Sequence, residues 1–314
     1  MGMAGRALQR VPTRGNAASL QQHKACPRSQ KPATFVGHSL ALQLALACAF
    51  PTLALASPDQ NCPSAGSESV QLAGIEARLE LRLEDGRLLR LAGFDPASST
   101  PSTPDGEDQA REALTQLLAG HPLTITKLSA APDRWGRLAV LAFIGDDQPG
   151  GVAAAAIASG LGRYLPEPAA HACRAILTTA EDTSRAQKLG LWADPYYAVL
   201  AASDLAGFAE RAGTLVVAEG RVASVKTSPY RSQLIFAGER NGSRGSQLLS
   251  ATLLPRTIKI LEAHGVHVSS LTGQLLRIRG LLDLRFGPEI ELLSPDDLDV
   301  LGPVIAPALA AGSK

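Results

Sequence analysis

The chain of 314 residues is long enough for two domains of ordinary size, each with its own core. Its composition, 45% hydrophobic and 19% charged, is that of a globular protein and excludes a wholly disordered chain. Aromatic residues make up only 4%, which argues against a surface built mainly of base-stacking platforms.

The first 56 residues differ from the rest of the chain. They hold six basic residues and no acidic one, and an apolar run from Leu40 ends at the small-x-small site Ala54-Leu55-Ala56. These features are typical of a secretory signal peptide. We therefore expect a leader over residues 1–56, cleavage after Ala56, a secreted or periplasmic protein, and no membrane span after processing. A mitochondrial transit peptide and a translation start near Val36 are the alternatives.

Removal of this leader changes the charge and the cysteine content. It would leave 24 basic residues against 29 acidic ones, a net charge of −5, with −6 over residues 57–200 and +1 over residues 201–314. Nucleic-acid-binding proteins normally concentrate positive charge, so this balance argues against binding driven by overall charge. Only Cys62 and Cys173 would remain, and an even pair in an exported protein predicts a disulfide between them. Two unrelated thiols are the alternative.

The first half begins with an N-terminal segment over residues 57–69, followed by alternating residues. Ala77, Leu79, Leu81 and Leu83 alternate with charged residues, and an Asp85-Gly86 turn leads into the strand 88–91, which predicts a β-hairpin. A helix is predicted over residues 105–118 and strands over 123–128 and 138–144, joined by a turn at Asp133 to Arg137. Two further helices are predicted over residues 150–160 and 171–188.

The second half shows another strand-rich pattern. Strands are predicted over residues 214–224, 233–237 and 248–254, a helix over 255–263, and strands over 275–282 and 289–293. Three strands, a helix and two strands form the order of an OB-type Greek-key barrel. The first half opens with the same order, so we expect an α+β fold, mainly β, with two OB-type barrels over residues 70–200 and 201–314.

Two segments of the first half resemble a known family. Arg90-Leu91-Ala92-Gly93-Phe94-Asp95-Pro96 resembles the Arg-Leu-x-Gly-Ile-Asp-Ala-Pro-Glu stretch of the staphylococcal nuclease, or thermonuclease, family. Asp133-Arg134-Trp135-Gly136-Arg137 is similar to that family's Asp-x-Tyr-Gly-Arg turn. The likeness covers roughly residues 70–200 and implies a first barrel of the staphylococcal nuclease kind. Residues 201–314 look like the C-terminal barrel of some bacterial members.

The resemblance implies roles for three residues. In that family, arginines clamp the phosphate, carboxylates hold a calcium ion, and a glutamate activates the attacking water. Arg90 and Arg137 match the phosphate-binding arginines, and Asp95 matches one metal-binding aspartate. Without the resemblance, Asp95 would be an ordinary turn residue and Arg137 a solvated charge at the start of a strand.

The other acids of the family are missing at the expected positions. Ser98 stands where the family has its general-base glutamate, and counting back from Gly86 places Leu79 at a metal-binding aspartate. Glu80 is the neighbouring acid, but the alternation places it on the polar face of the strand with Arg78 and Arg82. The six histidines show no metal-binding spacing, and no Ser-His-Asp or phosphate-loop motif is present.

These observations favour an exported, non-catalytic relative of the nuclease, a pseudoenzyme that acts as a binding or scaffold protein of the cell envelope. Such a protein needs no cofactor and is compatible with weak nucleotide or nucleic-acid binding at Arg90 and Arg137. The rival hypothesis is an active calcium-dependent nuclease in which other acids, such as Glu76, Glu107 or Asp108, replace the missing ones. The sequence identifies no protein partner.

Overall fold

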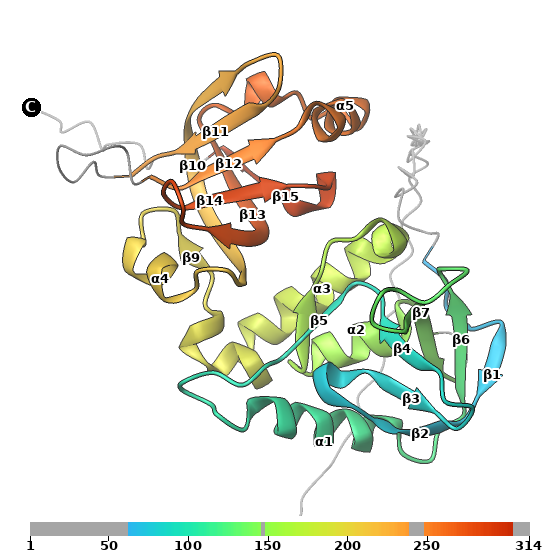
Figure 1. Cartoon of the computed structure of the whole chain (residues 1–314). Helices are drawn as coiled ribbons and strands as arrows, with labels where there is room; N and C mark the ends of the chain where they lie inside the picture. Colours follow the sequence, from blue (N-terminus) through green and yellow to red (C-terminus); the bar gives the residue numbers. More distant parts are fainter. Residues whose placement is uncertain (1–61, 146–147, 239–247, 304–314) are drawn as a thin grey trace, which may run out of the picture. The chain divides into compact units, whose positions relative to one another are not determined.

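The computed structural model describes residues 62–145, 148–238 and 248–303, and the protein is a mixed α+β fold made mostly of strands (Figure 1). The predicted leader, its cleavage site and residues 57–61 lie outside the described residues. Buried apolar side chains form two clusters, one drawn from Val70 to Tyr197 and the other from Leu200 to Leu298. None of the described helices is both long enough and apolar enough to cross a bilayer.

Over its described residues, 62–145 and 148–199, the first half contains a six-stranded sheet, a two-stranded sheet and three α-helices. In chain order, its elements are β1 (Glu68–Val70), β2 (Leu72–Ile75), β3 (Leu81–Leu83), β4 (Leu88–Leu91), β5 (Phe94–Pro96), α1 (Gly106–Leu118), β6 (Leu123–Lys127), β7 (Arg137–Ile144), α2 (Gly151–Ala158), β8 (Gly162–Tyr164) and α3 (Arg174–Ala186). The large sheet has the order β1-β6-β7-β4-β3-β2, and β5 pairs with β8. Its two outer strands, β1 and β2, are separated in sequence only by Gln71.

Local sequence explains several of these elements. The predicted hairpin is confirmed, because β3 and β4 are antiparallel and Gly86 in the turn has φ +85°, a conformation that glycine adopts without a Cβ clash. Helix α1 buries Ala110, Leu114 and Leu118 along one face, as the periodicity predicts. Strands β4 and β7 pair in parallel, which aligns Arg90 with Ala139 and places the start of β7 beside β4.

The strand predicted through Ala77 to Glu80 is wrong. Residues Ala77–Leu79 form a short 3-10 turn in which Arg78 and Leu79 have φ +57° and +55°. This left-handed conformation costs about 1–2 kcal/mol per non-glycine residue. Leu79 is only 2% exposed and belongs to the first apolar cluster, and burial of its side chain offsets that cost. The kink interrupts the strand and leaves Ala77 exposed, but burial still alternates from Leu79 to Leu83.

The second half contains a closed five-stranded barrel. Its elements are β9 (Leu200–Ala201), α4 (Leu205–Glu210), β10 (Leu215–Thr227), β11 (Ser232–Phe236), β12 (Ser250–Leu253), α5 (Pro255–Ala263), β13 (Gln274–Asp283), β14 (Glu289–Leu292) and β15 (Leu298–Pro303). The sheet order β13-β14-β12-β11-β10 is closed by pairing of β10 with β13. Helix α5 lies between β12 and β13 in sequence, as predicted. Strands β9 and β15 and helix α4 were not predicted.

The disulfide prediction agrees with the structure. Cys62 and Cys173 are bonded, with their sulfur atoms 2.06 Å apart, and the bond spans 111 residues of sequence. Cys173 is buried at the end of a 3-10 turn over Pro168–Cys173, directly before α3. The bond therefore ties the start of the described chain to the helical part of the first half.

A buried aspartate gives the second barrel a pH-dependent stability. Asp297 is 8% exposed and accepts hydrogen bonds from the backbone N–H groups of Leu293 and Ser294. Burial, with a smaller contribution from nearby Asp296, raises its pKa to about 6 against the effect of those hydrogen bonds. The folded state therefore holds the proton more tightly than the unfolded chain, and the stability gained from that proton is lost as pH rises from about 4 through about 6.

We expect Asp297→Asn to remove this pH dependence, because the amide is neutral at every pH and keeps an acceptor oxygen. A shift of about two pKa units corresponds to about 3 kcal/mol. The unfolding free energy of the variant should therefore rise relative to that of the parent by about this amount between pH 4 and pH 7. Urea unfolding across this range measures the difference between the two proteins. A difference that stays constant with pH would contradict the expectation.

Candidate functional site

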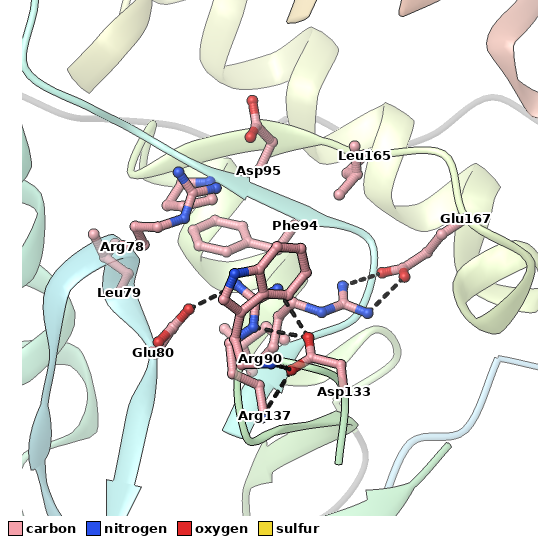
Figure 2. Close-up of a pocket in the computed structure, with 13 residues that line it drawn as sticks. Arg78, Leu79, Glu80, Arg90, Phe94, Asp95, Asp133, Arg137, Leu165 and Glu167 are labelled. Atoms are coloured by element: carbon pink, nitrogen blue, oxygen red, sulfur yellow. Dashed lines mark hydrogen bonds and ion pairs between the residues drawn. The ribbon is translucent and has the colours of Figure 1, made fainter. Parts of the chain in front are cut away.

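A hollow of about 330 Å³ in the first half is lined by Arg90, Arg137 and Asp95, the residues to which the family resemblance gives a role (Figure 2). We call it the arginine pocket. It is formed by the turn before β3, by β4 and β5, by the turn before β7 and by the segment after β8. Its lining residues are Arg78, Leu79, Glu80, Arg90, Leu91, Phe94, Asp95, Pro96, Asp133, Trp135, Arg137, Leu165 and Glu167. Arg90, Arg137 and Asp95 therefore line the same pocket.

Arg90 on β4 is held by a carboxylate of the chain itself. Its Nη1 and Nη2 atoms donate to Oε1 and Oε2 of Glu167 at 2.8 and 2.9 Å, the paired geometry visible in Figure 2. The backbone N–H of Gly93 donates to the same Oε1 at 2.6 Å. Guanidinium forks bind carboxylates and phosphates in this bidentate way. In this structure Glu167 occupies the bidentate face of the Arg90 guanidinium.

Arg137 at the start of β7 is shared by two acids. Its Nη1 donates to Glu80 Oε1 at 2.9 Å, and its Nε donates to Asp133 Oδ2 at 2.9 Å. Burial works to raise the pKa of Asp133, but hydrogen bonds from Arg137 and from the Trp135 backbone outweigh it and lower that pKa to about 2. Burial likewise works to lower the pKa of Arg137, but its bonds to Glu80 and Asp133 raise it. The guanidinium is thus charged, and its charge is compensated within the pocket.

Glu80 and Arg78 both line the pocket, on either side of the buried Leu79, in keeping with the polar face on which the alternation places them. There Glu80 binds Arg137. Leu79 is the residue that the count back from Gly86 places at a metal-binding aspartate of the family. It lines the pocket, but its side chain is buried in the core. The backbone N–H of Arg78 donates to Glu107 on α1 at 2.8 Å, which helps to hold the kink.

Asp95 on β5 is also paired with an arginine. Its Oδ2 accepts a hydrogen bond from Nε of Arg163 at 2.9 Å, and the two residues are direct neighbours in the β5–β8 pair. Figure 2 shows the Asp95 carboxylate directed away from those of Glu80 and Asp133. Within residues 62–145, 148–238 and 248–303, no three His, Cys, Asp or Glu side chains gather in a group that could hold a metal ion. Asp95 thus faces a fixed cation rather than other carboxylates.

Ser98, at the position of the family's general base, lies outside the arginine pocket. Its backbone N–H donates to Tyr197 Oη at 2.8 Å, its Oγ lies 2.9 Å from that oxygen, and the tyrosine hydroxyl donates to its carbonyl at 3.0 Å. Ser98 and Tyr197 line a separate hollow of about 500 Å³.

Asp194 fixes the loop that follows Ser98. It accepts hydrogen bonds from the hydroxyls of Thr100 and Thr103 and from the backbone of Tyr196. Burial alone would raise the pKa of Asp194, but these hydrogen bonds outweigh it and lower the pKa below its usual value. The ionised carboxylate therefore holds the loop in the conformation that turns Ser98 toward Tyr197.

Several residues of the pocket were not found by sequence reasoning. Glu167 and Arg163 carry no local signal, since each meets its partner through a contact 77 or 68 residues away in sequence. Trp135 is 60% exposed, and the guanidinium carbons of Arg134 and Arg137 lie 3.8 and 4.6 Å from the centre of its ring. Trp135 stands where the family's turn has an aromatic residue, and this position was the sequence signal for it. Its contact with two arginines could not be predicted from the sequence.

The chain was compared with known proteins. No protein-family model matches it, and a search of curated proteins gave no match.

Proposed function

We propose that this protein is a non-catalytic relative of the staphylococcal nuclease family, exported to the cell envelope, where it acts as a binding or scaffold protein. The closed barrel of the second half supports an OB-type fold, because its order β10-β11-β12-β14-β13, with β12 and β14 parallel, is that of a Greek-key barrel. The first half repeats the pattern in the antiparallel β3–β4 hairpin and the parallel pairing of β4 with β7.

The main support for the proposal is that the charged side chains of the arginine pocket form ion pairs with other side chains of the protein. Arg90 is paired with Glu167, Arg137 with Glu80 and Asp133, and Asp95 with Arg163. In the staphylococcal nuclease family, phosphodiester cleavage uses arginines that face the substrate and carboxylates that face a metal ion. Here each group of that kind faces another side chain. The disulfide supports export, because such bonds persist in oxidising compartments.

A cleavage assay tests this proposal. The purified protein should cleave single-stranded or plasmid DNA at least about 10²-fold more slowly than an active family member, because absence of a general base alone costs 10²–10⁴ in rate. Neither calcium nor a chelator should change the residual rate.

Arg90→Ala and Arg82→Ala serve as the test and control variants in this assay. Arg82 is a half-buried arginine on the neighbouring strand and does not line the arginine pocket. A trace activity that is equal in both variants would come from a contaminant and would leave the proposal intact. Calcium-dependent cleavage that is lost in Arg90→Ala and retained in Arg82→Ala would contradict it and favour the active nuclease.

A further inference from the structure

The side chain of Glu167 is bound in the arginine pocket in the manner of a ligand. Its carboxylate receives three converging hydrogen bonds, two from the Arg90 guanidinium and one from the Gly93 backbone. A bidentate guanidinium with an adjacent backbone N–H is a complete set of donors for a tetrahedral or planar oxyanion. We infer that this set is an oxyanion site which the chain fills with its own glutamate, and that a phosphate group binds there only by displacing Glu167.

The donor from Gly93 is part of a built site. Gly93 has φ +74°, and a Cβ at this position would lie 2.5 Å from Leu177 Cδ1 and 2.9 Å from the Cβ of Ala170. Only glycine fits this close approach, and the conformation aims its N–H at the carboxylate. The carbonyl of Gly93 in turn accepts a hydrogen bond from the N–H of Leu165 at 3.0 Å. The backbone on both sides of the contact is therefore fixed independently of Glu167.

The position of Glu167 in the chain makes it an effective competitor. It lies in extended conformation between Pro166 and Pro168, which restrict the backbone on each side. The 3-10 turn that follows ends at Cys173 of the disulfide. A carboxylate held this way acts at a high effective concentration, so an external anion meets an occupied site.

Charge also favours this interpretation. In the part of the chain that the structure describes, Arg90 forms an ion pair with Glu167 and with no other acid, whereas Arg137 has two acids. Neutralising Glu167 would therefore leave Arg90 as a cation at the wall of a hollow of about 330 Å³. The same change would not affect the compensation of Arg137. The inference rests on the proposed binding function and adds an autoinhibitory contact to it.

The test uses inorganic phosphate as the probe and Glu167→Gln as the variant. The glutamine amide keeps an acceptor for Gly93 but loses the negative charge. Its phosphate affinity should exceed that of the parent protein by roughly 10- to 100-fold, the range set by hydrogen bonds to charged groups. Binding is followed by the change in tryptophan emission, since Trp135 lines the pocket and the second tryptophan, Trp192, is buried elsewhere and serves as a constant background. Chloride at equal ionic strength is the reference. Glu84→Gln, the same change at an exposed residue on the adjoining turn, should bind as the parent does.

Three results would overturn the inference: equal affinity in Glu167→Gln and the parent, equal gain in Glu84→Gln, or binding that persists in Glu167→Gln/Arg90→Ala. If Glu167→Gln does not fold, the parent protein provides the test. High phosphate should then shift the amide resonance of Gly93 in the NMR spectrum, and absence of that shift would reject displacement. DNA cleavage by the parent protein would contradict the proposed function without deciding this point, because phosphate binding is measured separately.

Discussion

Glu181→Ala is expected to lower the free energy of unfolding by about 3–5 kcal/mol. Glu181 on α3 is 3% exposed, and its Oε2 and Oε1 atoms lie 2.9 and 3.2 Å from Nη1 of Arg279 on β13. Arg279 is 1% exposed, and its Nε and Nη2 have no hydrogen-bond partner among the described residues. Removal of the carboxylate leaves the buried Arg279 with only the Tyr164 carbonyl and the more distant Asp299, whose Oδ2 lies 3.8 Å from Nη2. Loss of the close partner of a buried charge carries a penalty of this size. Chemical denaturation followed by circular dichroism measures the loss.

Two further variants separate the buried charge from a general effect of truncation. Glu112→Ala, on the exposed face of α1, should change the unfolding free energy by no more than about 0.5 kcal/mol. Glu181→Leu/Arg279→Leu should recover much of the stability lost in Glu181→Ala, because it removes both charges together. A loss below 1 kcal/mol in Glu181→Ala would show that the cation finds other compensation.

Removal of the disulfide is the second large effect. Replacing Cys62 and Cys173 with alanine should destabilise the protein by about 4 kcal/mol, since the bond closes a loop of 111 residues in sequence and restricts the unfolded chain. Alanine avoids placing a hydroxyl at the buried Cys173 position. The protein starting at Ser57 is suited to the experiment, because it carries only these two cysteines.

Reductant supplies the matched control. It should lower the denaturation midpoint of the parent to nearly that of the alanine variant and should leave the variant unchanged. Thiol labelling of the unreduced, unfolded parent should detect no free cysteine. A parent whose midpoint is insensitive to reductant, or whose thiols react before reduction, would contradict the pairing.

Much of the fold follows from short-range patterns. The Asp85-Gly86 hairpin, the apolar face of α1 and the helix α5 between strands were predicted because turn chemistry and periodicity act within a few residues. Strand β15 (Leu298–Pro303) was not predicted, since its sequence contains an aspartate, a glycine and a proline. It pairs with β13, whose partner residues lie 20 to 29 positions earlier. Its stability in this position comes from the partner strand rather than from its own composition.

For the arginine pocket, a different kind of feature could not be predicted from the sequence. Arg90, Arg137 and Asp95 were predicted through family resemblance, and they share one pocket. Their partners Glu167 and Arg163 were not, because ion pairs between distant segments leave no periodic signal. The pairing of Glu80 with Arg137 was not predicted either, because the two residues are 57 positions apart in sequence. Leu79, which the count from Gly86 places at a metal-binding aspartate of the family, is buried in the core. Substituting an acid at Leu79 would therefore bury a carboxylate rather than restore a metal ligand.

The edges of the large sheet are formed by β1 and β2, which are joined through Gln71, and this arrangement affects how readily the protein can self-associate. Unpaired strand edges are the templates on which other chains add strands, and long flat edges lead to aggregation. In the large sheet of the first half, the two outer strands have three and four residues and are consecutive in the chain. Such short edges give an incoming strand few backbone groups to pair with. We therefore expect partly unfolded forms that keep this sheet to resist fibril growth by strand addition.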